Sequence, residues 1–130
     1  MRNVFAIFIV PWVWFAFAVP GNQLVFLVYP EARDGQTPLD FLLVSLVASA
    51  FYTFMAAAIC CWIAKPDFTR IGLLVPLALL AFGVFTQIVY WDVLPLWYHL
   101  VAIAFILPVA MAGTNLVTRR RNTRSIVQVT

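Results

Sequence analysis

Four apolar stretches constrain this chain most, because each is long enough to cross a lipid bilayer as a helix. They cover residues 4–29, 38–64, 71–91 and 93–117. A helix crosses the hydrocarbon layer in about 20 residues, since each residue adds about 1.5 Å. Apolar residues make up 65% of the 130 residues and charged residues 10%, whereas a soluble domain is about half apolar and about a quarter charged. A domain of this length cannot bury such an excess, so an integral membrane protein is predicted.

The pattern within the stretches indicates helices rather than strands. Membrane β-strands alternate polar and apolar residues over about ten positions, and residues 73–84 show no such alternation. The segments between the stretches are short, so consecutive helices are expected to be antiparallel neighbours. We predict an all-α bundle of four transmembrane helices in up-down-up-down order over residues 1–118, followed by a basic cytoplasmic tail over residues 119–130.

Capping residues and prolines refine the expected ends and shapes of the helices. Thr37 is expected to be the N-cap of the second helix, with Pro38 at its first position. Asp92 is expected to cap the fourth helix. Pro11 and Pro108 lack a backbone N–H donor, so kinks are expected in the first and fourth helices.

The eight Lys and Arg side chains divide unequally between the two ends of the predicted bundle. Seven lie at the end that holds both termini, and only Arg33 lies at the other. Basic residues accumulate in cytoplasmic segments, so both termini are predicted to be cytoplasmic. The opposite, outer end also carries four of the five carboxylates and a belt of aromatic residues. The seven basic residues are Arg2, Lys65, Arg70, Arg119, Arg120, Arg121 and Arg124; the belt is Tyr29, Tyr90, Trp91, Trp97 and Tyr98.

Two aspects of processing and location stay open at this stage. Arg2, an apolar run and the segment Ala16-Phe17-Ala18 together resemble a cleavable secretory signal, whose removal would leave three helices. The alternative is a retained first helix, because apolar residues resume after that segment. The arginine bias fits our preferred location, a bacterial inner membrane, and equally a eukaryotic internal membrane.

Small residues recur every four positions in two of the stretches. Membrane helices associate through close packing of small side chains, so such rows predict helix contacts. With no catalytic motif in the chain, they favour a non-catalytic accessory or assembly subunit, or a homo-oligomeric membrane component. The rows are Ser45, Ser49, Thr53, Ala57 and Cys61 in the second stretch, and Ala104, Pro108 and Ala112 in the fourth.

Each stretch also places one polar side chain at a similar depth below the outer end, and buried polar groups in membranes are candidates for function. In one interpretation Gln87 and Ser45 satisfy the hydrogen bonds of His99 and clamp the bundle. In the other, His99 is the titratable centre of an outward-facing pocket, with Asp92 two turns above it on the same helix face. The candidate pocket residues are Gln23, Ser45, Ser49, Gln87, Tyr90, Asp92, Tyr98 and His99.

The pocket interpretation gives the alternative functions. The first is binding or transport of a small ligand, and a weaker one is an enzyme that acts on a lipid, sterol or isoprenoid. We expect no cofactor or metal, because the chain carries no corresponding motif. The basic tail is expected to bind anionic lipid head groups and not nucleic acid, since aromatic residues do not interleave with its charges. The tail residues are Arg119, Arg120, Arg121 and Arg124.

Overall fold

A computed structural model of the chain describes residues 1–64 and 71–129. This part of the chain is helical and contains no strand, so the prediction of an all-α protein is confirmed. Four helical segments correspond to the four predicted stretches, the first of them divided in two. The elements are α1 (Arg2–Phe8), α2 (Val10–Val28), the 3-10 helix η1 (Pro30–Asp34), α3 (Leu39–Ile63), α4 (Ile71–Val89) and α5 (Leu96–Val129).

Prolines determine where several helices begin. The first segment breaks at Ile9, because the ring of Pro11 excludes a regular helical turn before it. Pro38, not Thr37, is the N-cap of α3, since its ψ of 155° is extended and helical angles begin only at Leu39. The predicted cap at Asp92 is also wrong, because α5 begins at Leu96, directly after Pro95. A residue that precedes proline is disfavoured in a helix, which keeps the turn from 90 to 94 out of α5.

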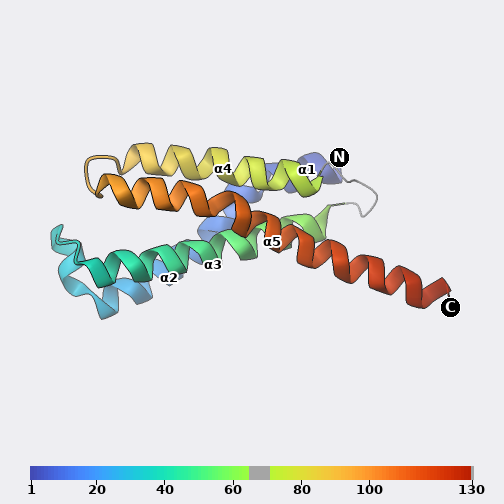
Figure 1. Cartoon of the computed structure of the whole chain (residues 1–130), viewed down its shortest axis with the longest axis horizontal. Coiled ribbons are helices and arrows are strands. Elements are labelled where there is room, and N and C mark those ends of the chain that lie inside the picture. The colour runs from blue at the N-terminus through green and yellow to red at the C-terminus, as the bar shows by residue number, and fades with distance from the viewer. Residues whose placement is uncertain (65–70, 130) are drawn as a thin grey trace.

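The helices form an arc rather than a square bundle. The most extensive contact joins α3 and α5, which run parallel; α2 packs on α3, α4 packs on α5, and α3 and α4 contact each other much less. The order across the arc is therefore α2, α3, α5, α4. Figure 1 shows the line of α1 and α2 running obliquely across the other helices. α1 lies near α4 at the end that holds the N-terminus, and α2 lies on α3 toward the other end. We call the end that holds the N-terminus the terminal end, and the end with η1 and the turn from 90 to 94 the loop end.

The backbones of α3 and α5 approach closely at Gly113. A Cβ atom built at this glycine would lie 2.6 Å from the carbonyl oxygen of Phe54 and 3.1 Å from the Cβ of Ala57. Thr53, Ala57 and Cys61 of the predicted row are buried here, while Ser45 and Ser49 lie nearer the loop end and are partly exposed.

The predicted row on the fourth helix does not pack within the chain. Ala104, Pro108 and Ala112 are exposed on α5. A second set of small residues on another face is buried instead, and it follows the 3.6-residue period of the helix. Its members are Ala102, Ala110, Gly113 and Thr114. α5 bends in the stretch that contains Pro108 (Figure 1).

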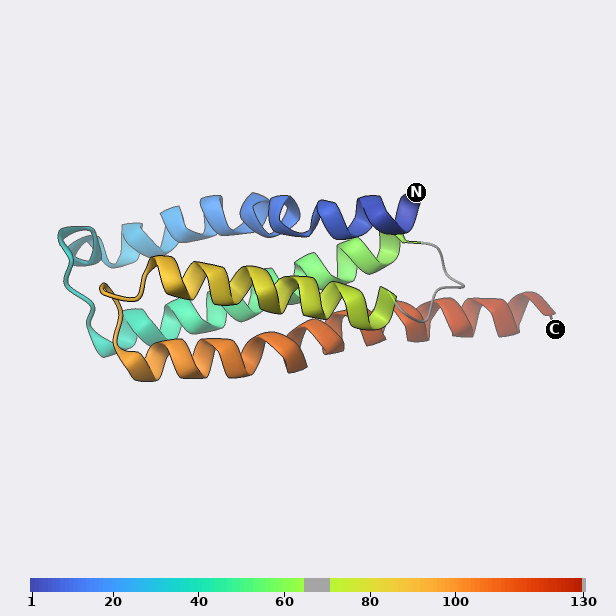
Figure 2. The same ribbon diagram turned by 90° about the horizontal axis from the view of Figure 1, so that it is seen from above.

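Two arginines bind the carbonyl groups at the C-terminal end of α3. Arg2 donates from Nε and Nη2 to the Ile63 oxygen at 3.3 and 2.9 Å. Arg121 donates to the oxygens of Trp62 and, at 3.2 Å, Ala64. The last carbonyls of a helix have no partner within it and carry partial negative charge, so cations are favourable there. The segment predicted as a tail is thus a continuation of α5, which extends beyond the other helices to Val129 (Figure 2).

Three helical segments are long and apolar enough to cross a membrane: Arg2–Val28, Leu39–Ile63 and Leu96–Val129. Leu73–Val89 in α4 is a shorter apolar helix. Large apolar side chains are exposed along the outer faces of these helices, among them Trp12, Val47 and Trp62. Soluble monomers rarely expose apolar surface on this scale, so the structure is compatible with a membrane protein.

Candidate ligand cavity

A cavity of about 560 Å³ occupies the concave side of the arc, toward the loop end. Its floor is formed by buried side chains of α3 and α5, including Phe41, Tyr52 and Tyr98. Its rims are exposed side chains of α2 and α4, such as Val19 and Phe85. A buried floor between exposed rims means that the cavity opens sideways, between α2 and α4.

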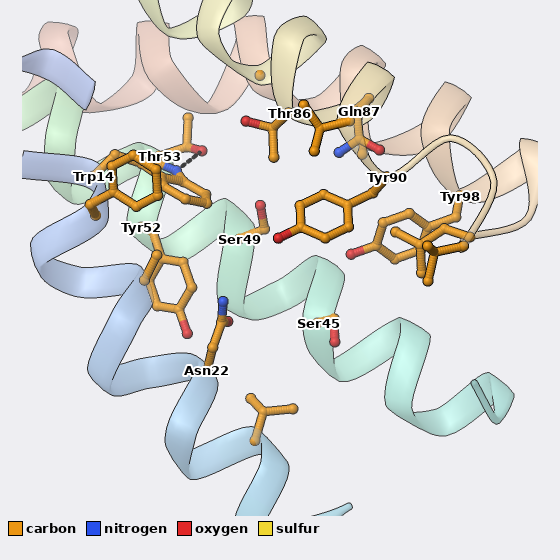
Figure 3. Close-up of a pocket in the computed structure, with 18 of the residues that line it drawn as sticks. Trp14, Asn22, Ser45, Ser49, Tyr52, Thr53, Thr86, Gln87, Tyr90 and Tyr98 are labelled. Carbon is orange, nitrogen blue, oxygen red and sulfur yellow. Dashed lines mark hydrogen bonds between the residues drawn. The ribbon is translucent and has the colours of Figure 1, made fainter. Parts of the chain in front are cut away.

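Neutral polar groups from four helices project into this apolar cavity (Figure 3). None of the described residues that line it is charged, and aromatic rings form much of its wall. Sites for small molecules combine apolar walls with a few polar groups that orient the ligand. The polar lining residues are Asn22, Thr37, Ser45, Ser49, Tyr52, Thr53, Thr86, Gln87, Tyr90 and Tyr98.

Trp14 forms the wall of the cavity toward the terminal end. Its indole N–H donates to Oγ1 of Thr53 at 3.3 Å, the bond drawn in Figure 3. Its ring makes edge contacts with Phe15, Tyr52 and Phe82 at centroid distances of 5.5 to 5.9 Å. The hydrogen bond and these contacts from three helices fix the orientation of the indole.

His99 lies behind the cavity wall rather than in the cavity. Its side chain is 1% exposed and stacks on Trp91 with ring centroids 4.8 Å apart. Nδ1 lies 2.5 Å from Oε1 of Gln87, while Nε2 faces the backbone oxygens of Trp91 at 3.3 Å and Leu94 at 3.2 Å. The ring therefore joins α4, the following turn and α5. Gln87 lines the cavity, whereas His99 does not.

The structure brings together five of the eight predicted pocket residues, which are Ser45, Ser49, Gln87, Tyr90 and Tyr98. Three do not line the cavity. Gln23 is exposed and accepts a hydrogen bond from Arg33 at 3.4 Å. Asp92 is exposed in the turn, because the helix expected to align it with His99 begins four residues later. His99 is satisfied by Gln87, as the clamp interpretation proposed, although Ser45 faces the cavity instead of joining them.

The predicted pocket residues and the cavity lie at the same end of the bundle, but the prediction did not include several lining residues. Asn22 takes the position expected of Gln23, since one residue along a helix turns the side chain by about 100°. Tyr52 and Trp14 do not stand out in the sequence, because aromatic residues are frequent throughout this chain and the prediction of the pocket rests on intramembrane polar side chains. Tyr98, expected in an interfacial belt, is buried against the cavity instead.

No thiol lines the cavity in the part of the chain that the structure describes. Cys60 and Cys61 are buried free thiols near the terminal end, outside the cavity lining. Within residues 1–64 and 71–129, no group of three or more His, Cys, Asp or Glu side chains is placed to hold a metal ion. Comparisons with models of protein families, with curated proteins and with solved structures find no match for this chain.

Proposed function

We propose that this protein binds an uncharged, largely apolar small molecule within the membrane. The cavity supports this proposal, because it offers about 560 Å³ lined by aromatic rings and neutral hydrogen-bonding groups. A charged ligand would lose its hydration without gaining a partner of opposite charge. An apolar molecule with one or two hydroxyl, ether or carbonyl groups gains both kinds of contact.

The sideways opening gives the proposal a route of entry. We place the four helices across the membrane with both termini cytoplasmic, as the distribution of Lys and Arg favours. The loop end then faces the outer leaflet, and the opening between α2 and α4 faces lipid. A bacterial inner membrane is the location that we prefer. Arg119, Arg120 and Arg124 are exposed on α5 for anionic lipid, whereas Arg121 is engaged with α3.

The test uses 1-pyrenebutanol, a neutral aromatic alcohol, and the protein in lipid nanodiscs. Pyrene absorbs where tryptophan emits, so binding near Trp14 is expected to transfer tryptophan emission to the probe in a saturable way, with one probe per chain. Ser49→Phe is expected to abolish the saturable component by filling the cavity. Val47→Phe, which adds the same ring on the exposed face of α3, is expected to leave it unchanged. Transfer that never saturates, or equal loss in both variants, would contradict the proposal.

A second candidate, an accessory or oligomeric subunit, is supported by the exposed small residues of α5. Ala104, Pro108 and Ala112 offer a face on which another helix can pack closely. Under this proposal, native mass spectrometry from nanodiscs gives a multiple of the 14.7 kDa chain or a mass that includes other polypeptides. Ala112→Leu is expected to return the mass to that of a single chain. A single chain in the unaltered protein argues against this candidate.

A further inference from the structure

His99 and Gln87 form a unit whose hydrogen bonds depend on the protonation state of the imidazole. Three oxygen atoms surround the imidazole: Oε1 of Gln87 at Nδ1, and the backbone oxygens of Trp91 and Leu94 at Nε2. Oxygens of this kind only accept hydrogen bonds, so this arrangement needs a proton on both ring nitrogens. With the Gln87 amide in this orientation, all three contacts are hydrogen bonds only when the ring is the imidazolium.

A neutral imidazole requires a different arrangement of the same atoms. It carries one proton, and the backbone oxygens of Trp91 and Leu94 cannot turn away from Nε2, so the proton stays on Nε2. Nδ1 is then an acceptor and needs a donor. The amide of Gln87 supplies one by turning through about 180°, which exchanges its oxygen and its NH2 group without moving the rest of the side chain.

This exchange changes what the cavity offers to a ligand, because Gln87 lines it beside Thr86 and Tyr90 (Figure 3). We infer that Gln87 sets the hydrogen-bonding specificity of the cavity and that His99 is the positioning residue that selects its orientation. With the imidazolium, the NH2 group of Gln87 faces the ligand and donates. With neutral His99, the amide oxygen faces the ligand and accepts. The inference rests on the proposed function.

No charged side chain competes for this role within the part of the chain that the structure describes. Tyr98 is the titratable residue whose ring contacts His99, with centroids 6.3 Å apart, and Tyr90 lines the same cavity from the end of α4. The charged groups of the loop end are all exposed. They are Glu31, Arg33 and Asp34 in η1, Asp40 in the first turn of α3, and Asp92 in the turn before α5.

Two probes that differ in one hydrogen test the consequence for binding. 1-Pyrenebutanol both donates and accepts, whereas its methyl ether only accepts. The Kd of the ether is expected to rise by about fivefold between pH 5 and pH 8, the factor that one hydrogen bond contributes, while that of the alcohol stays constant. Gln87→Met and His99→Phe are each expected to remove the pH dependence. Asp92→Asn is the matched control and is expected to keep it. A constant ratio of the two affinities in the unaltered protein, or loss of the effect only in Asp92→Asn, would overturn the inference.

A direct measurement on His99 separates this inference from the proposed function. The chain contains one histidine, so ¹⁵N-histidine labelling gives the signals of a single imidazole without assignment. The neutral ring is expected to carry its proton on Nε2, and Gln87→Met is expected to shift the Nδ1 signal. A neutral ring protonated on Nδ1 would overturn the inference even if the probes bind. Failure of both probes to bind would instead refute the cavity as a ligand site, whatever the histidine shows.

Discussion

Gly113→Ala tests the close packing of α3 against α5. The new Cβ would lie 2.6 Å from the oxygen of Phe54, 3.1 Å from the Cβ of Ala57 and 3.3 Å from the amide nitrogen of Ala58. Two of these atoms are backbone atoms within a helix, so the helices must separate. Overpacking of this kind costs about 1–3 kcal/mol, and alanine regains about 1 kcal/mol of helix propensity. Because the backbone atoms cannot turn away, we take the upper part of that range, about 2–3 kcal/mol, so the expected net loss is about 1–2 kcal/mol.

Gly83→Ala is the matched control for this prediction. Its Cβ would lie 2.2 Å from Cδ1 of Ile106, the far end of a flexible side chain that borders the cavity and has room to turn. The same gain in propensity is then expected to leave stability unchanged or slightly raised. Unfolding by SDS in mixed micelles, followed by tryptophan emission, gives both free energies. Equal losses in the two variants, or none at Gly113, would refute the assignment of the α3–α5 contact.

Three further substitutions test other parts of the structure by the same unfolding assay. Arg121→Gln is expected to cost about 1–2 kcal/mol, because it removes the charged donor at the end of α3, whereas Arg124→Gln on the exposed face is expected to change little. Thr53→Val is expected to cost about 1 kcal/mol, because it leaves the indole N–H of Trp14 without its acceptor. An unchanged free energy of unfolding would mean that the folded protein does not form this hydrogen bond. Gly35→Ala is expected to cost about 1–2 kcal/mol, because φ is 83° at this position, a backbone conformation that residues with a Cβ rarely adopt. No neighbouring atom lies within 4 Å of the new Cβ, so the whole cost comes from the backbone, and a neutral result would mean that the loop changes its conformation.

The sequence predicts the number and approximate limits of the helices, because both follow from the local hydropathy. It does not predict which faces meet. In a soluble helix the apolar stripe marks the buried side, but every side of these helices is apolar. Two sets of small residues therefore compete on α5, and the row through Pro108 is as small as the one through Gly113. Only the position of α3 decides between them.

The candidate site shows the same contrast, because the sequence predicts how deep a residue lies in the bundle but not which way its side chain points. The depth of a residue follows from counting along the chain, and Ser45 and Gln87 do line the same cavity. Direction depends on where each helix begins and how it is turned. α5 begins after Pro95, so Asp92 does not lie on the same helix as His99. In α2, the side chain that lines the cavity is that of Asn22 and not that of its neighbour Gln23. These are effects of tertiary packing and of local backbone geometry that a count of depth does not contain.

The same packing explains why this cavity lies at the loop end. At the terminal end, small residues such as Ala57, Cys60 and Ala110 bring the helices together, and α1 closes the arc against α4. At the loop end, larger residues such as Phe41 and Tyr98 hold α3 and α5 as a broad floor. The break at Ile9 lets α2 diverge from α4 over this floor. The cavity is therefore a consequence of how the helices must be arranged, and its neutral polar lining is the feature that a purely structural role leaves unexplained.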